Sequence, residues 1–193
     1  MENKFNLPTE TVDLPSKGLL YPKDSPLAEG KIEMKYMTAK EEDILTNSNY
    51  IRQGVVIDKL LQSLIVSPIN YSDLLIGDKD AVMMAARILG YGKDYDFLYL
   101  GEKVTVDLST LNLKELNESL VKEKGKNEFQ FKLPNTDNTV TFKLLTQKDD
   151  RDIEAELEGL KKLNKNDNSE LTTRLKYMIL SVNGNYERAT VRQ

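Results

Sequence analysis

Proline is concentrated at the start of this 193-residue chain, and that concentration limits what the first segment can fold into. Four of the six prolines, Pro8, Pro15, Pro22 and Pro26, lie within the first 30 residues. Proline fixes φ, cannot donate a backbone hydrogen bond and restricts the residue before it. The sequence therefore predicts an extended, peripheral arm over residues 1–30, with little regular pairing.

The same segment is too apolar for an ordinary disordered tail. Its central stretch reads LPSKGLLYP at residues 14–22, where leucines and a tyrosine stand among turn-forming residues. Such a segment usually lies against another surface. A disordered leader, docking onto the body of the chain and docking onto a partner all stay open at this point. For a partner, the candidate contact residues are Leu14, Pro15, Ser16, Gly18, Leu20, Tyr21 and Pro22.

An alternating strand and a capped helix follow the arm. Apolar Ile32, Met34 and Tyr36 alternate with charged residues, which predicts a half-buried strand over residues 31–37. Thr38-Ala39-Lys40-Glu41 then matches the capping box, in which a threonine and a glutamate satisfy the first free amides of a helix. We therefore expect a short helix up to about residue 46.

The remaining periodicity predicts helices at residues 53–65, 79–89, 111–121, 146–163 and 171–182. Two pairs of alternating runs predict β-hairpins at residues 95–108 and 129–144. Asp78 is the expected cap of the helix at 79–89, and Gly90 and Gly92 are its expected stop. Met83 and Met84 are expected to fill the core.

These elements indicate an α+β fold. Its expected parts are an extended N-terminal arm, a small helical lobe, an antiparallel β-hairpin region and a C-terminal helical pair. In residue numbers, the corresponding regions are 1–30, 31–92, 93–145 and 146–193.

The composition excludes much of enzyme chemistry. The chain contains neither histidine nor cysteine, which rules out disulfides, thiolate nucleophiles, cysteine-ligated zinc and a histidine-activated serine. A carboxylic acid could act near neutral pH only if its pKa rose by about 3 units, at a cost of about 4 kcal/mol. The acids at residues 149–158 share their predicted helix with Lys148, Arg151, Lys161 and Lys162, and such a mixture of charges is typical of a solvated helix face. We expect no catalytic residue and no cofactor.

Binding of metals, nucleic acids or membranes is also not indicated. The pairs Asp94/Asp96 and Asp78/Asp80 lack the further oxygen ligands of a calcium loop. Gly90-Tyr91-Gly92 follows a predicted helix instead of opening one, so it is not a phosphate loop. The net charge of -4 provides no overall basic field for nucleic acid. No run of eighteen apolar residues and no signal peptide is present, so we expect the protein in the cytosol.

Several motifs together resemble one protein family. They are LPSKGLLYP, the strand after it, MTAKEEDIL at residues 37–45, and a helix pair ending in LGYG at 89–92. This pattern is similar to the baseplate hub subunit family of T-even-type contractile-tailed bacteriophages, whose members share an LPS-x-G-x-x-Y arm before an M-T-x-x-E-E helix. The similarity is strongest over residues 13–92 and extends through Leu133-Pro134 to residues 144–153. Some members carry cysteine pairs in the β region, whereas residues 98–108 here contain none, so no metal is carried over.

The resemblance implies a non-enzymatic role in building the baseplate hub, through contacts with other hub or tail proteins. The protein would be a structural component or an assembly factor absent from the finished particle. It would work in the host cytoplasm and, as a structural component, also in the virion tail. The alternatives are a tail-assembly chaperone and, more remotely, a carboxylate-dependent hydrolase. The sequence does not decide whether the chain forms homo-oligomers.

Overall fold

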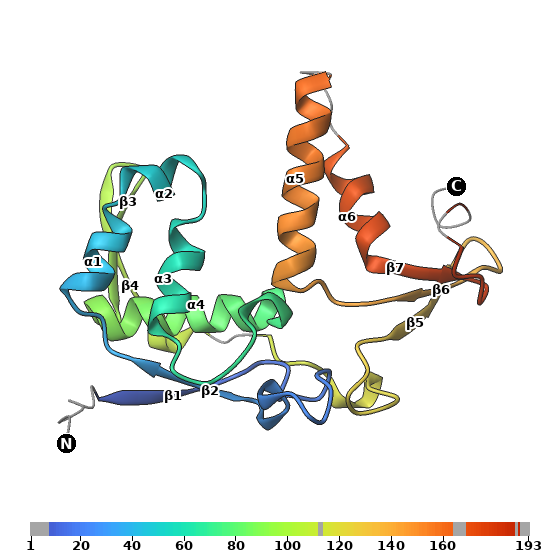
Figure 1. Cartoon of the computed structure of the whole chain (residues 1–193), viewed down its shortest axis with the longest axis horizontal. Coiled ribbons are helices and arrows are strands. Elements are labelled where there is room, and N and C mark those ends of the chain that lie inside the picture. The colour runs from blue at the N-terminus through green and yellow to red at the C-terminus, as the bar shows by residue number, and fades with distance from the viewer. Residues whose placement is uncertain (1–7, 112–113, 164–168, 188, 190–193) are drawn as a thin grey trace. The chain divides into compact units, whose positions relative to one another are not determined.

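A computed structural model describes residues 8–111, 114–163, 169–187 and 189. Within them the chain combines α-helices with three small antiparallel sheets, as expected for an α+β fold (Figure 1). The chain divides into two compact units. The first comprises residues up to 18, 24–69 and 77–116, and the second comprises 19–23, 70–76 and residues from 117 onward. Neither unit is one contiguous stretch, so the four successive regions expected from the sequence do not coincide with them.

The first unit holds two small sheets and most of the short helices. Its elements are β1 (Thr9–Asp13), β2 (Lys31–Lys35), α1 (Ala39–Leu45), α2 (Ser48–Arg52), α3 (Val56–Leu64), α4 (Ile76–Tyr91), β3 (Asp94–Tyr99) and β4 (Glu102–Asp107). Ile76, the first residue of α4, is assigned to the second unit. β1 pairs with β2 in antiparallel register, from Thr9 opposite Lys35 to Asp13 opposite Lys31. Ile32 and Met34 of β2 are buried, which confirms the alternating strand.

The helix predicted from the capping box is also confirmed. The backbone N–H and the hydroxyl of Thr38 donate to Glu41 Oε2 at 3.0 and 2.5 Å, and α1 begins at the next residue, Ala39. α3 confirms the predicted helix at residues 53–65, although it begins only at Val56. α2 was not predicted, because its five residues have no apolar stripe; the Asn47 side chain caps it.

Residues 14–27 of the N-terminal segment contribute buried side chains to the protein, which corrects the expectation of a peripheral arm there. β1 before them is extended, as expected. Leu14 and Leu27 have side chains that are 3% and 0% exposed, as buried as any core residue. The Leu14 N–H donates to the Gly30 carbonyl at 2.8 Å, so the chain turns back on itself beside β2. The prolines exclude long ladders, but they allow the compact turns that residues 14–30 form.

α4 differs from its prediction at both ends. It begins at Ile76 and ends at Tyr91, so Asp78 is no cap and Gly90 lies inside the helix. A Cβ at Gly90 would lie 2.4 Å from the Met37 sulfur, which explains a glycine there by close packing. Met83 is exposed instead of filling the core.

The second unit combines a three-stranded sheet with a pair of helices (Figure 1). Its regular elements are β5 (Phe129–Lys132), β6 (Thr139–Phe142), α5 (Gln147–Leu163), α6 (Glu170–Met178) and β7 (Ile179–Val182). The hairpin of β5 and β6 and the helix α5 confirm the predictions. The predicted helix at 171–182 ends early, because residues 179–182 add β7 to the sheet edge beside β6.

The helix predicted at residues 111–121 is wrong in its described part. A single 3-10 turn at Glu118–Leu120 is present there, and residues 112 and 113 lie outside the described part of the chain. The Asn117 side chain accepts the Ser119 N–H at 3.1 Å, a local bond that competes with helix formation. Three leucines at helical spacing therefore did not suffice for a helix.

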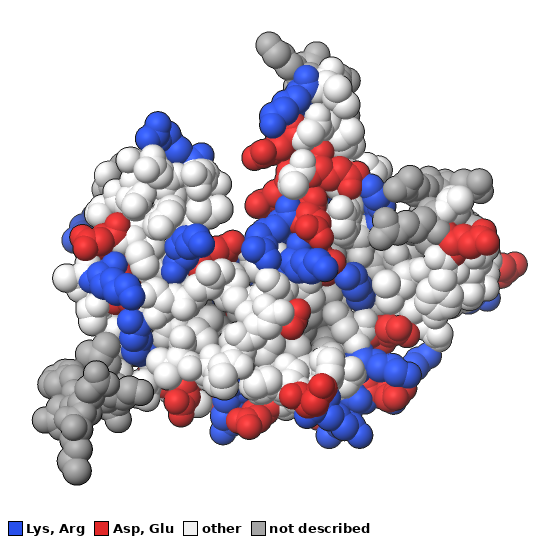
Figure 2. Space-filling view, viewed as in Figure 1, with Lys and Arg blue, Asp and Glu red and all other residues white. Residues whose placement is uncertain are grey.

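Acidic and basic side chains mix along α5, as expected of a solvated helix (Figure 2). Asp149 is the exception, because it is buried at the first turn of the helix. Lys143 Nζ lies 2.7 and 2.8 Å from its two carboxylate oxygens, and the Thr146 hydroxyl donates to Oδ2 at 2.9 Å. Burial raises the pKa of Asp149, but these hydrogen bonds outweigh it and hold the pKa below its ordinary value.

Candidate protein interaction site

The seven residues proposed from the sequence for partner binding are mostly internal. Five are buried: Leu14, Ser16, Gly18, Leu20 and Tyr21. Pro15 is half-buried and Pro22 is exposed. A partner could reach these residues only if they were exposed, whereas five of the seven are buried within the protein. Partner binding through this stretch stays a prediction that rests chiefly on Pro22.

The LPSKG turn has a structural explanation in the first unit. The Ser16 N–H and hydroxyl donate to the two carboxylate oxygens of Asp78 at 2.9 and 2.6 Å, and both residues are buried. Gly18 has φ +73°, and a Cβ there would lie 2.3 Å from the Ala28 carbonyl oxygen. Serine and glycine are therefore required by the fold itself at these two positions.

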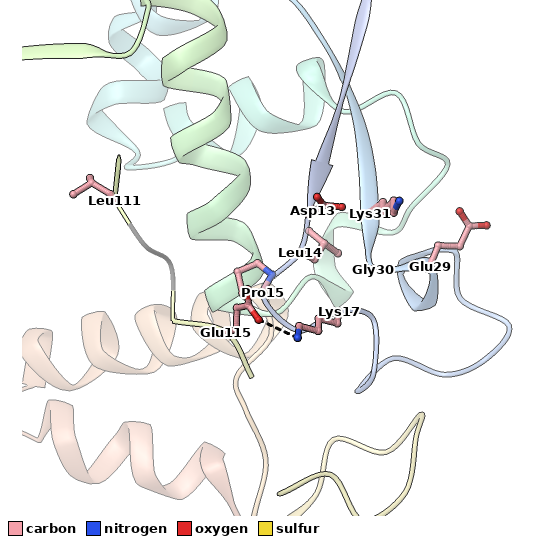
Figure 3. A pocket seen from close by; sticks show the side chains of 9 residues that line it. All are labelled: Asp13, Leu14, Pro15, Lys17, Glu29, Gly30, Lys31, Leu111 and Glu115. Carbon is pink, nitrogen blue, oxygen red and sulfur yellow. Dashed lines mark ion pairs between the residues drawn. The ribbon is translucent and has the colours of Figure 1, made fainter. Parts of the chain in front are cut away.

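A pocket of about 510 Å³ lies beside this turn (Figure 3). Its lining residues are Asp13, Leu14, Pro15, Lys17, Glu29, Gly30, Lys31, Leu111 and Glu115. Lys17 and Glu115 form an ion pair at 2.9 Å, and both side chains are well exposed to water. Within the described residues, no group of three or more acidic side chains is placed to hold a metal ion. The pocket is thus lined by charged side chains of both signs.

A second pocket, of about 440 Å³, lies in the second unit next to β7. Its ionisable lining includes Lys143, Lys176, Asp149 and Asp152. Lys143 is paired with Asp149, and Lys176 with Glu156. A general acid needs a raised pKa, whereas the pKa of Asp149 is lowered. The arrangement stabilises α5 and α6 and does not resemble a catalytic pair.

The hairpin of β3 and β4 presents the most exposed apolar surface of the first unit. Residues from Asp94 opposite Asp107 to Tyr99 opposite Glu102 pair in antiparallel register, which confirms the predicted hairpin. Leu100 and Gly101 connect the strands with φ values of +52° and +86°, as in a type I′ turn. Every residue of β3 is exposed.

Five large apolar side chains form what we call the hairpin surface. They are Tyr95, Phe97, Leu98, Tyr99 and Leu100, with exposed fractions of 44%, 38%, 74%, 62% and 89%. Alternation along β3 places the three aromatic rings on one face of the hairpin. Opposite them on β4 lie Val104 and Val106, which are half-buried. One face of this two-stranded sheet is therefore apolar and only partly covered.

Aromatic and cationic side chains extend this face onto α4. The Arg87 guanidinium carbon lies 5.0 Å from the ring centroid of Tyr91 and 5.5 Å from that of Tyr95, both within cation–π range. The Tyr91 hydroxyl donates to Glu42 at 2.8 Å, and this bond raises the pKa of Tyr91. These contacts fix the base of the hairpin while its tip stays exposed.

The opposite face of the hairpin carries charged side chains together with Leu98. Asp96 accepts hydrogen bonds from Lys103 at 2.8 Å and from the Thr105 hydroxyl at 2.6 Å, and these bonds lower the pKa of Asp96. Lys93 pairs with Asp107, whose pKa falls to about 2 through the bond from Lys93 and those from Ser109. Asp96, one of the four aspartates considered as metal ligands, thus serves as a cross-strand partner of Lys103 and Thr105.

Comparison with protein-family models, curated proteins and solved structures gives no match to this chain. Among the described residues, no helix is both long enough and apolar enough to span a membrane. The candidate site therefore rests on the geometry of the chain itself.

The exposure of the hairpin surface was not predicted from the sequence. Alternation identified the strands, because Tyr95, Phe97 and Tyr99 are spaced by two. It did not show whether another element covers the aromatic face. The one available signal was Leu100-Gly101 at the turn, since a leucine at a loop tip has no core to enter.

Proposed function

We propose that this protein acts in assembly of the baseplate hub of a T-even-type contractile phage tail, through protein–protein contacts made by the hairpin surface. The observation that carries the proposal is the aromatic face of β3, which is exposed at Tyr95, Phe97 and Tyr99. Contiguous exposed apolar surface of this kind is characteristic of protein interaction sites. Tyrosine and phenylalanine are also enriched at the centres of interfaces.

The energetics favour a covered hairpin. Burying one large apolar side chain contributes about 1.5 to 3 kcal/mol, so several such residues on one hairpin could supply much of a binding energy. A two-stranded hairpin is only marginally stable in water by itself. A partner that covers the aromatic face would therefore stabilise the hairpin. Burial of the same aromatic side chains would also contribute to the binding affinity.

The motif resemblance supplies the biological context. LPSKGLLYP, MTAKEEDIL and LGYG occur in the order typical of the baseplate hub family. In this fold they form the N-terminal turn, the capped helix α1 and the end of α4 beside the hairpin. The proposal therefore assigns the motifs mainly to the scaffold and the partner contact mainly to the hairpin surface.

An assembly experiment tests this function. Phe97→Ser/Tyr99→Ser should remain folded, because both side chains are exposed, and should fail to join hub complexes when co-expressed with the other hub proteins. Ile51→Ser is the matched control, since Ile51 is 54% exposed on α2 outside the hairpin surface. Normal assembly by the hairpin variant would refute the proposed contact.

A tail-assembly chaperone is the second candidate, favoured by the same exposed apolar face, which could hold an unassembled partner. Mass spectrometry of purified particles separates the two roles. A structural component is present in stoichiometric amount, whereas a chaperone or assembly factor is absent. A carboxylate-dependent hydrolase has less support, because Asp149, a buried acid beside a pocket, has its pKa lowered.

A further inference from the structure

We propose that β3 is a docking edge for an extended segment of a partner protein in which lysine or arginine alternates with apolar residues. The inference rests on the proposed function, because it names the partner chemistry of the same hairpin. Within the described part of the chain, β3 pairs with β4 alone, so its other edge has no neighbouring strand. Its exposed residues leave that edge accessible. Such edges accept added strands in many peptide complexes.

The hydrogen-bond pattern shows which backbone groups face the open edge. The Leu108 N–H donates to the Lys93 carbonyl at 2.8 Å, which makes these two residues a hydrogen-bonded pair. In an antiparallel ladder, bonded and non-bonded pairs alternate. The N–H and C=O groups of Asp94, Asp96 and Leu98 therefore point away from β4. An incoming antiparallel strand would meet three residues with properly spaced donors and acceptors.

Side-chain alternation specifies the incoming sequence. Asp94 and Asp96 share one face of β3, and the aromatic residues Tyr95, Phe97 and Tyr99 share the other. Opposite charges and apolar pairs are the favourable partners directly across two strands. A partner strand should therefore place lysine or arginine opposite the aspartates and apolar side chains opposite the aromatic rings.

Charge also disfavours one symmetric pairing of β3 with a second copy of this chain. Residues 93–107 contain four acidic and two basic side chains, so the hairpin is net acidic. β3 has two aspartates and no basic residue. Antiparallel pairing of two β3 strands centred on Asp96 would place carboxylates opposite each other, which is destabilising. A basic partner strand removes this repulsion, and salt should weaken its binding.

Synthetic peptides provide a direct test on the full-length protein. A peptide that alternates lysine and valine should slow hydrogen exchange of the Asp94, Asp96 and Leu98 amides, as measured by NMR. It should bind about tenfold more tightly than the peptide that alternates glutamate and valine, because two cross-strand charge pairs change sign. Equal binding of the two peptides, or no protection of these amides, would overturn the inference.

N-methylation tests backbone pairing separately from charge. In the proposed antiparallel register, the lysine residues of the peptide direct their N–H groups toward β3. Methylating the lysine amides should therefore abolish binding, whereas methylating the valine amides should preserve it. If both methylated peptides bind alike, the contact is not strand addition and the inference fails.

A variant of the protein tests the acidic residues. Asp94→Lys/Asp96→Asn should lose the preference for the lysine peptide. The hairpin should stay paired, because the introduced lysine lies opposite Asp107 and the asparagine carbonyl oxygen at position 96 can accept the Thr105 hydrogen bond. Asp80→Lys on α4 adds a similar positive charge outside β3, two units against three, and should keep the preference. An unchanged preference in the β3 variant would contradict the inference.

The two proposals can fail separately. If the peptides leave β3 unprotected but Phe97→Ser/Tyr99→Ser blocks hub assembly, the strand-addition inference is overturned and the proposed function stands. If the lysine peptide binds β3 as expected but the same variant assembles normally, the docking edge stands and its role in hub assembly is refuted.

Discussion

Glu41 is a buried carboxylate that joins three elements of the first unit. Its side chain is 0% exposed, and it accepts hydrogen bonds from Lys35 at 2.8 Å, Ser63 at 2.6 Å and the Thr38 backbone at 3.0 Å. Burial raises the pKa, but these bonds outweigh it and bring the pKa from its ordinary 4.5 to about 2. The carboxylate thus ties β2 and α3 to the start of α1.

Glu41→Gln should destabilise the protein by about 3 kcal/mol, because it removes one partner of a buried ion pair. Urea unfolding followed by circular dichroism measures the change. Glu42→Gln is the neighbouring control; its side chain is exposed and should cost less than about 1 kcal/mol. A similar loss of unfolding free energy in both variants would show that the buried carboxylate of Glu41 stabilises the protein no more than an exposed one.

Stability should also depend on acid pH through Glu41. Its folded pKa is depressed, so its contribution is fully present above pH 4.5 and is lost as the pH falls toward 2. The stability difference between the wild type and Glu41→Gln should therefore shrink between about pH 6 and about pH 3. A difference that stays constant over this range would contradict the assignment.

Leu100 adopts a backbone conformation that suits glycine or asparagine better than leucine. Its φ is +52° at the tip of the hairpin. Leu100→Asn should stabilise the hairpin by about 1 kcal/mol, because asparagine tolerates this conformation and Asn-Gly favours the turn. Hydrogen exchange of the paired hairpin amides measures the gain. Leu98→Asn, at a residue that is also highly exposed but lies in ordinary strand conformation, should give no such gain.

At the scale of elements, the turn at residues 14–30 shows why short motifs are ambiguous. Gly18 and Gly30 both have positive φ, and a Cβ on either would lie within 2.8 Å of backbone atoms across the turn. The motif could belong to a docking arm or to a packed turn, because both need glycine and proline. The packed turn is identified only by a contact that the motif does not contain: the Ala28 carbonyl, ten residues downstream, lies close against Gly18.

Gly18→Ala should destabilise the protein by at least about 2 kcal/mol, through backbone strain and a clash with the Ala28 carbonyl. Gly54→Ala provides a control with similar φ, +69°, and no atom within 4 Å of the added Cβ. It should cost only about 1 kcal/mol. Thermal unfolding of the two variants compares the clash with strain alone, and equal losses would exclude the clash.

At the scale of the whole molecule, several apolar side chains of residues 14–27 belong to the protein interior. Leu14, Leu20, Tyr21 and Leu27 are all less than 5% exposed. Each buried side chain of this size contributes about 1.5 to 3 kcal/mol, which is comparable in total with the stability of a small domain. The segment also supplies β1, the only partner of β2 in its sheet within the described residues.

Deletion of residues 1–30 should therefore abolish cooperative unfolding of the first unit, because β2 would lose its partner strand and the core would lose Leu14 and Leu27. Differential scanning calorimetry and amide exchange of α1 and α3 measure this effect. Pro22→Ala/Lys23→Ala, which changes two exposed residues of the same segment, should unfold like the wild type. A truncated protein that still melts cooperatively would restore the interpretation as a separable arm.

The sequence by itself determined the elements whose causes are local. Alternation specified β2 and both hairpins, and the Thr38–Glu41 capping box specified the start of α1, because strand periodicity and capping involve residues close in the chain. Only the tertiary structure decided that Asp78 binds Ser16 instead of capping a helix, and that residues 179–182 leave a helical pattern to extend a sheet. It likewise decided that Leu14, Leu20, Tyr21 and Leu27 of the proline-rich segment are buried and that the hairpin is exposed. Burial depends on which distant segments meet, and contacts between residues dozens of positions apart leave no periodic signal in the chain.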